Sequence, residues 1–332
     1  MPSKGGRCGR IRAMDFVITH NTALHYLRTQ DGGLHRRTLR PGRCTRPNTE
    51  LTCYDVTDIP EEEPLHAAIF SEEERRRSPQ GVTWHLLKLE ELPPQSFVPV
   101  STKVWADSPE LCFVHMAAQL PFVPLVELGY ELCGDYSRDQ DSPRGFADRK
   151  PLTSAQALAD YADAAAGMYG ARQARWAARY VLDGAASPME AAVAMLLCLP
   201  SSRGGYGFEA PQLNGPVSVP ASMQKSVGAK TLHCDLLWPD YNVGIEYNSD
   251  QYHSDGRSKE RDSERSNVFE RRRIHVIEVT RKDVLDLYRF EDVAAKGLAE
   301  ATGRRLRIRS KRFEQERRKL RTALFSWGRI VP

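Results

Sequence analysis

The sequence predicts an α/β protein whose C-terminal half runs in the order helix, strand, strand, helix, strand. Three observations predict this order. An apolar helix with a clear start and stop spans residues 187–200, two strand-like runs flank a short loop between residues 232 and 247, and a highly charged helix precedes a β-branched run at residues 274–280. A mixed α+β domain and a helical linker are expected before this unit.

The N-terminal domain, residues 1–150, is expected to be mixed α+β. Periodicity and capping residues predict a helix at 19–29, a strand at 97–105, and helices at 108–121 and 123–134. The acidic clusters 61–63 and 72–74 flank an apolar patch, residues 66–70, and are interpreted as solvated loops or helix starts. A basic run after the first helix makes this domain a candidate for DNA binding.

A linker is predicted at residues 137–150, because this segment is polar and contains Pro and Gly. The helical linker that follows, residues 151–185, contains two Ala-rich stretches whose small side chains favour close helix contacts. Trp176 and Tyr180 lie four residues apart in the second stretch and are expected to pack together.

Glu190 has two possible roles, and the sequence does not decide between them. Ser187 is the predicted N-cap of the helix at 187–200, with Pro188 at its first position and Glu190 at its third. In a capping box the Glu190 carboxylate reaches back to the Ser187 N–H. Its place one helix before an acidic hairpin also makes Glu190 a candidate third carboxylate of a site.

Asp235 and Glu246 lie on the two predicted strands of a hairpin whose four-residue loop is 239–242. A symmetric loop pairs Trp238 with Val243 and so places Asp235 directly opposite Glu246. Like charges at such positions destabilise an antiparallel pair. A hard divalent cation such as Mg²⁺ between the two carboxylates removes that penalty. The alternative is a solvated hairpin face with two unrelated acids.

Further polar residues follow the hairpin where the chain leaves the sheet edge: Asn248, Asp250 and His253. Residues 256–273 lack Pro and internal Gly and are predicted to form a helix. This helix contains Lys259, and its Asp262 and Arg265 share one face because they are three residues apart.

Together these motifs resemble the PD-(D/E)XK nuclease core, the restriction-endonuclease-like fold. More narrowly, residues 186–300 are similar to small endonuclease-like domains related to the very-short-patch-repair enzymes. The motifs that carry the resemblance are, in order, Asp235, residues 245–248, His253, residues 262–265 and residues 276–280.

The resemblance implies hydrolysis of DNA phosphodiesters. Asp235 and Glu246, with Glu190 in support, would hold one or two Mg²⁺ or Mn²⁺ ions, which lower the pKa of a bound water and screen the scissile phosphate. Arg265 would contact phosphate, or else pair with Asp262 and support the helix.

The sequence departs from the family pattern at Asn248, where the family has a Lys two residues after the second acid. That Lys positions the attacking water, so its absence weighs against hydrolysis. His253 and Lys259 are the candidates to replace it in catalysis. The alternative for His253 is a hydrogen-bonded structural histidine.

The net charge of +4 combines basic ends with an acidic middle. Basic ends favour a polyanionic partner such as DNA. The candidate DNA contacts in the basic C-terminal extension, residues 301–332, are Arg304, Arg305, Arg307, Lys311 and Arg312. The alternative is a solvated or disordered tail.

Hydropathy and cysteine spacing set the expected location. No apolar run is long enough to cross a membrane, and the N-terminus lacks the apolar region of a signal peptide. The seven cysteines are widely spaced without a C-x-x-C motif, so neither a disulfide framework nor a cysteine-based zinc site is predicted. The chain is expected in the reducing cytoplasm.

The domain order is also similar to that of bacterial abortive-infection antitoxins of the AbiEi type. In those proteins the front domain binds DNA as a repressor, and the back domain acts without needing cleavage. This resemblance implies a second hypothesis, a non-catalytic DNA-binding regulator or antitoxin with a cognate toxin or another defence-system partner.

Overall fold

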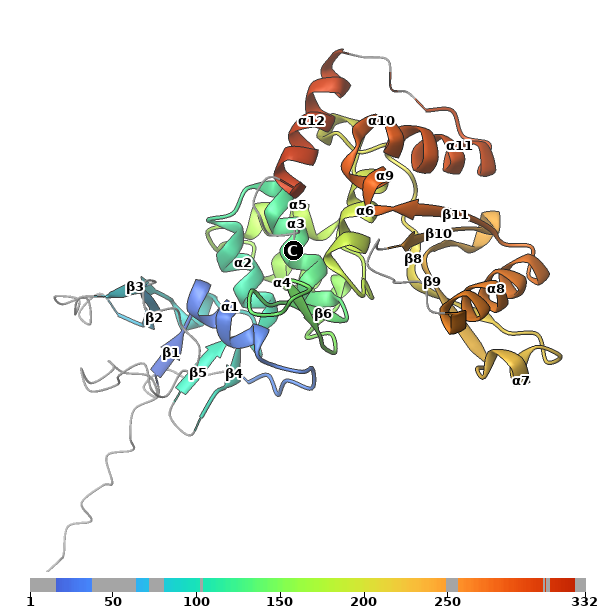
Figure 1. Cartoon of the computed structure of the whole chain (residues 1–332). Helices are drawn as coiled ribbons and strands as arrows, with labels where there is room; N and C mark the ends of the chain where they lie inside the picture. The colour runs from blue at the N-terminus through green and yellow to red at the C-terminus, as the bar shows by residue number, and fades with distance from the viewer. Residues whose placement is uncertain are drawn as a thin grey trace, which may run out of the picture.

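The computed structural model describes residues 16–37, 64–71, 81–101, 104–248, 256–306, 308 and 311–325, and the side chains of residues 256–262 lie outside this description. The described residues are mixed α/β, with two larger sheets on either side of a central group of helices (Figure 1). One hydrophobic core runs through all three parts, from Val17 to Leu324. The predicted α/β class is confirmed.

The first sheet has the strand order β3-β2-β1-β5-β4. Its strands are β1 (Phe16–Ile18), β2 (Leu65–Ile69), β3 (Val82–Leu86), β4 (Phe97–Pro99) and β5 (Val104–Asp107). Strands β1 and β5 are parallel, with Ile18 opposite Ala106. The next residues along the two strands, Thr19 and Asp107, therefore lie at the same end of the sheet.

The apolar patch 66–70 lies largely in β2, whose last three residues are buried, and the acidic clusters that flank it, 61–63 and 72–74, lie outside the described residues. One prediction for this region is corrected. The strand predicted at 97–105 is two antiparallel strands, β4 and β5, because the chain turns where the Val100 N–H donates to the Val104 carbonyl. The helix predicted at 19–29 is confirmed as α1 (His20–Arg28).

The central helices are α2 (Pro109–Ala117), α3 (Phe122–Cys133), α4 (Ala155–Ala164) and α5 (Ala171–Ala178). As expected from its Ser-Pro start, α2 is capped by the Ser108 hydroxyl, which accepts a hydrogen bond from the Leu111 N–H. Trp176 and Tyr180 pack edge to face with ring centroids 6.4 Å apart, as predicted. Helix α2 packs against α3, α4 and α5, so the helices before and after residue 150 form one group.

The linker predicted at residues 137–150 is wrong. Strands β6 (Tyr136–Arg138) and β7 (Phe146–Asp148) pair as a hairpin, with Gly145 at positive φ near its tip. The buried Arg149 guanidinium donates to the backbone carbonyls of Leu27, Glu131 and Tyr136. The Pro and Gly residues of this segment thus form a hairpin tip rather than a domain boundary.

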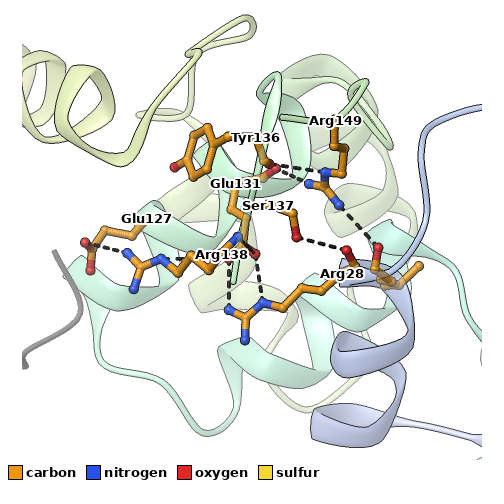
Figure 2. A network of polar contacts seen from close by, with 8 residues as sticks. Arg28, Glu127, Glu131, Tyr136, Ser137, Arg138 and Arg149 are labelled. Atoms are coloured by element: carbon orange, nitrogen blue, oxygen red, sulfur yellow. Dashed lines mark hydrogen bonds and ion pairs between the residues drawn. The ribbon is translucent and has the colours of Figure 1, made fainter. Parts of the chain in front are cut away.

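Figure 2 shows the polar network that ties this hairpin to α1 and α3. The Arg28 guanidinium donates to both oxygens of the buried Glu131, at 2.7 and 2.9 Å. Arg138 donates to Glu127 at 2.9 Å and lies 4.0 Å from Glu131. Burial opposes ionisation of Glu131, but Arg28, Arg138 and Arg149 outweigh it and lower its pKa to about 2.

The second sheet has the order β11-β10-β9-β8. Its strands are β8 (Gln212–Ser218), β9 (Thr231–Trp238), β10 (Val243–Asn248) and β11 (His275–Thr280). Strand β9 is antiparallel to both neighbours, whereas β10 and β11 are parallel and are connected through α8 (Gly256–Arg271). The predicted helix, strands and second helix occur in the expected sequence, but a strand that was not predicted, β8, lies between α6 (Pro188–Cys198) and β9.

Helices cover both faces of this sheet. Helix α6 (Pro188–Cys198) contacts β9, and η6 (Glu291–Lys296) and α11 (Gly297–Ala301) contact β11. On the other side, Val268 and Phe269 of α8 pack with Cys234 and Leu237 of β9. The other short helices are η3 (Leu89–Glu91), η4 (Ser201–Arg203), α7 (Gln224–Val227), η5 (Pro239–Tyr241), α9 (Arg281–Leu285) and α10 (Leu287–Phe290).

Helix α12 (Lys311–Phe325) packs back onto the central helices (Figure 1). It buries Phe313, Leu320 and Leu324 and contacts η4, α3 and α6. The predicted basic extension therefore contains a helix that belongs to the main core. Within the described part of the chain, no helix combines the length and apolar character needed to cross a membrane.

Candidate functional site

The hairpin register agrees with the prediction. Trp238 pairs with Val243 and Leu236 with Ile245, so Asp235 and Glu246 occupy the next facing positions. At these positions, backbone N–H groups donate to side-chain carboxylates instead of to backbone carbonyls. The Tyr247 N–H donates to Asp235 Oδ2 at 2.8 Å, and the Asp235 N–H donates to Glu246 Oε1 at 3.3 Å. The two carboxylates are thus held beside each other.

Glu190 lies at the start of α6, and its capping interpretation is partly correct. The Ser187 hydroxyl accepts from the Glu190 N–H at 3.2 Å and donates to Glu190 Oε1 at 2.9 Å. The other carboxylate oxygen accepts from the Ala186 N–H at 2.8 Å, not from the expected Ser187 N–H. Glu190 is buried, at 8 % exposure, and the carboxylate that caps α6 also lies close enough to Asp235 to raise its pKa.

Asn214 is a site residue that the sequence did not reveal. On β8, Leu213 pairs with Leu236 and Gly215 with Cys234, so Asn214 lies opposite Asp235 on the side away from Glu246. Its Nδ2 donates to the Gly184 carbonyl at 2.6 Å and contacts Glu190 Oε2 at 3.4 Å. Asn214 has a φ of 47°, a left-handed conformation that Asn tolerates better than most residues.

The three carboxylates interact electrostatically. Burial, followed by the negative charges of Glu190 and Glu246, raises the pKa of Asp235 to about 8. The pKa of Glu190 is also raised by burial, against hydrogen bonds from Ala186, Ser187 and Asn214, and the charge of Glu246 adds to the rise. A bound cation would relieve this crowding of negative charge.

Arg265 of α8 neutralises the third carboxylate. Its guanidinium donates to Glu246 Oε2 through Nε at 2.9 Å and through an Nη atom at 2.7 Å, and it also donates to the His233 carbonyl. The ring of Phe269 lies 5.3 Å from the guanidinium carbon. The described partner of Arg265 is therefore Glu246, and the side chain of Asp262, the predicted partner, lies outside the described residues.

The spacing of the carboxylates bears on metal binding. In the described part of the chain, the one group of three His, Cys, Asp or Glu residues whose ligand atoms all lie within 4.8 Å of one another is His20, Asp107 and His115. Glu190, Asp235 and Glu246 are more widely spaced than that. To hold one ion together, they must move closer and Arg265 must release Glu246.

Of the remaining predicted site residues, some are exposed and others lie outside the described part of the chain. Asn248 is exposed at the end of β10, opposite Thr280. His253, Asp250, Arg307 and the side chain of Lys259 lie outside the described residues. Arg304 is exposed, with its guanidinium 5.1 Å from the Phe208 ring, and Arg305, Lys311 and Arg312 are also exposed.

Function is inferred from these residues alone, because the chain matches no protein-family model, no curated protein and no solved structure. The site offers three carboxylates from three elements, an arginine bound to one of them, and an amide beside another. Such a set is suited to a hard cation and a phosphate group.

Proposed function

We propose that residues 186–300 form a nuclease-like domain that hydrolyses DNA phosphodiesters with Mg²⁺ or Mn²⁺ held by Asp235, Glu246 and Glu190. One observation carries the proposal: carboxylates from β9, β10 and α6 lie in one largely buried region, close enough for the charges of Glu190 and Glu246 to raise the pKa of Asp235. Burying like charges together is unfavourable without a compensating cation, and such arrangements are typical of functional sites.

The topology supports the restriction-endonuclease-like resemblance. A helix, α6, precedes three antiparallel strands, and the helix α8 then leads to a strand parallel to the third. Asp235 and Glu246 lie on adjacent central strands of this sheet, where the resemblance puts the acidic pair.

The residues have separate roles in the proposed reaction. A metal ion bound by the carboxylates would supply an activated water and screen the phosphate charge. Asp235 would lose its proton as it becomes a ligand, because its pKa of about 8 leaves much of it protonated at neutral pH. Arg265, once it releases Glu246, has the planar donor geometry to bind a phosphate oxygen pair.

Nicking of supercoiled plasmid DNA tests this proposal. The wild-type protein is expected to cleave with Mg²⁺ or Mn²⁺ and not with EDTA, and Asp235→Asn and Glu246→Gln are expected to lose at least about 100-fold in rate. Asp240→Asn is the matched control, because Asp240 is an exposed acid in the loop of the same hairpin. Cleavage that survives Asp235→Asn contradicts the site assignment.

A second candidate function is favoured by the Arg265–Glu246 pair together with Asn248. A paired Glu246 and a missing lysine fit a non-catalytic DNA-binding regulator, including an antitoxin with a cognate toxin. This function predicts DNA binding that persists in EDTA and in Asp235→Asn, with no cleavage under any metal. Binding that requires a divalent ion contradicts it.

A further inference from the structure

Four histidines from four different elements gather in the N-terminal part of the fold: His20 of α1, His66 of β2, His85 of β3 and His115 of α2. The His20 ring stacks between two others, 3.7 Å from His85 and 4.4 Å from His115 between centroids. His66 Nδ1 and His85 Nε2 are hydrogen-bonded at 2.8 Å. Such a gathering of imidazoles is a concentrated set of potential metal ligands.

Asp107 and Thr19 organise two of these rings. Asp107 Oδ2 accepts hydrogen bonds from the Thr19 hydroxyl at 2.6 Å, the His20 N–H at 3.0 Å and His115 Nδ1 at 2.8 Å. The Thr19 hydroxyl uses its one proton in the hydrogen bond to Asp107, so it accepts from Nδ1 of His20 at 3.0 Å and of His115 at 2.9 Å. The single Nδ1–H of His115 is shared between Thr19 and Asp107. Both rings therefore carry their proton on Nδ1 and keep a lone pair on Nε2. The two rings are stacked within 3° of parallel, so one ring must turn before both lone pairs can face one ion.

Two acceptor atoms in this cluster have no donor. His115 Nε2 and Asp107 Oδ1 are buried and have no hydrogen-bond partner in the described part of the chain. Their residues are 4 % and 0 % exposed. Buried acceptors without a donor are unfavourable and rare, and a cation satisfies a lone-pair nitrogen and a carboxylate oxygen alike.

The backbone adds an independent sign of a functional site. His20 has a φ of 52°, a left-handed conformation that is uncommon for residues other than Gly, although His adopts it more readily than most. Residues held in such conformations cluster at ligand sites, because the surrounding structure must impose them. Here the His20 N–H is fixed by its bond to Asp107.

We propose that His20, Asp107 and His115 bind one divalent transition-metal ion of the Zn²⁺ type. One ligand atom from each of the three lies within 4.8 Å of the others. Imidazole nitrogens with a carboxylate suit Zn²⁺, Co²⁺ or Ni²⁺, whereas Mg²⁺ prefers oxygen ligands. The Thr19 hydroxyl orients both rings as an outer-shell partner. His66 and His85, which are only partly buried, stack beside the His20 ring.

This site does not depend on the proposed nuclease activity, because it lies in the other sheet region and uses different residues. The test uses full-length protein stripped with EDTA, re-equilibrated with Zn²⁺, and freed of unbound metal. Elemental analysis is expected to give one Zn²⁺ per chain for the wild type, for the exposed-histidine control His275→Gln and for Asp235→Asn. His20→Gln and His115→Gln are each expected to lose it.

Two further measurements keep the proposal testable if a variant misfolds. X-ray absorption at the zinc edge of the wild type is expected to show histidine ligation without sulfur, and Zn²⁺ is expected to raise the Tm of the wild type and not of His115→Gln. Three outcomes overturn the proposal: zinc stays bound in both folded histidine variants, Asp235→Asn removes the zinc, or the wild-type protein takes up no zinc.

Discussion

Arg265 of α8 and Glu246 of β10 form a two-point ion pair, with N–O distances of 2.9 and 2.7 Å. The Glu246 side chain is 13 % exposed and that of Arg265 is 32 % exposed, so the pair is only partly solvated. The positive charge of Arg265 offsets the negative charge of Glu246, which lies near Asp235 and Glu190. The ion pair is therefore a stabilising contact, and it must break before Glu246 can bind the proposed metal ion.

Removing Arg265 is expected to destabilise the protein. Arg265→Ala leaves Glu246 without its cationic partner beside Asp235, and the free energy of unfolding should fall by about 2–3 kcal/mol. The Glu246→Gln, Arg265→Ala double variant should lose less than the sum of the single changes, because the uncompensated charge is gone. Urea unfolding of the four proteins measures this, and strictly additive losses would show that the pair contributes nothing.

Asp235 is expected to make stability fall as pH rises. Because its pKa is raised from 3.8 to about 8 in the folded protein, the folded state holds a proton that the unfolded chain has released. The contribution of this proton linkage to the free energy of unfolding is therefore complete below about pH 4, and it is lost as the pH rises to about 8. Asp235→Asn should equal the wild type at about pH 4 and exceed it at about pH 8.5.

Urea midpoints at several pH values check the Asp235 prediction. Asp240→Asn, in the exposed loop of the same hairpin, should show no such trend. A gain from Asp235→Asn that is the same at every pH would mean that the Asp235 carboxyl is not perturbed.

Glu131 is expected to have the opposite pH dependence. Arg28, Arg138 and Arg149 lower its pKa from 4.5 to about 2 despite burial, so its contribution is present above about pH 4.5 and is lost as pH falls towards 2. Glu131→Gln leaves Arg28 without its partner and should cost about 3–5 kcal/mol at neutral pH.

Thermal or urea unfolding from neutral pH to about pH 3 checks the Glu131 prediction. The gap between Glu131→Gln and the wild type should narrow as the pH falls. Asp148→Asn is the control, since it breaks an exposed ion pair with Arg144 and should change stability by less than about 0.5 kcal/mol. A gap that widens in acid would contradict the ion-pair account.

If the protein binds DNA through α12, the affinity should depend on the two exposed basic residues at the N-terminal end of this helix. Lys311 and Arg312 are exposed, whereas Arg318 and Lys319 are paired with Glu314 and Glu316. The Lys311→Ala, Arg312→Ala double variant should reduce the slope of log affinity against log salt by about 2. The Arg318→Ala, Lys319→Ala double variant should change it less, and an equal effect of both pairs would remove α12 as a specific contact surface.

The hairpin of the candidate site was predictable because its information is local. A four-residue loop between two apolar runs fixes the pairing of Trp238 with Val243, and the pleat then places Asp235 and Glu246 together. The capping residues of α6 were predictable for the same reason. Strand β8 was missed because Asn214, Gly215 and Pro216 are typical turn residues, although burial alternates along the strand.

Long-range contacts were not predictable from local patterns. Arg265 was expected to contact phosphate or to pair with Asp262, whose side chain lies outside the described residues. The partner that the structure describes is Glu246, on another element. Thr19 and His115 are 96 residues apart and meet only because β1 and β5 are parallel neighbours. No spacing rule links His20, Asp107 and His115, so the histidine cluster became visible only in three dimensions.

Binding of Mn²⁺, measured by electron paramagnetic resonance as loss of the free-ion signal, tests the central claim most directly. The carboxylate site predicts a class of bound Mn²⁺ in the wild type that Asp235→Asn abolishes, that Arg265→Ala retains, and that His20→Gln leaves unchanged. Mn²⁺ binding that is identical in the wild type and in folded Asp235→Asn would contradict a metal site at Asp235, Glu246 and Glu190.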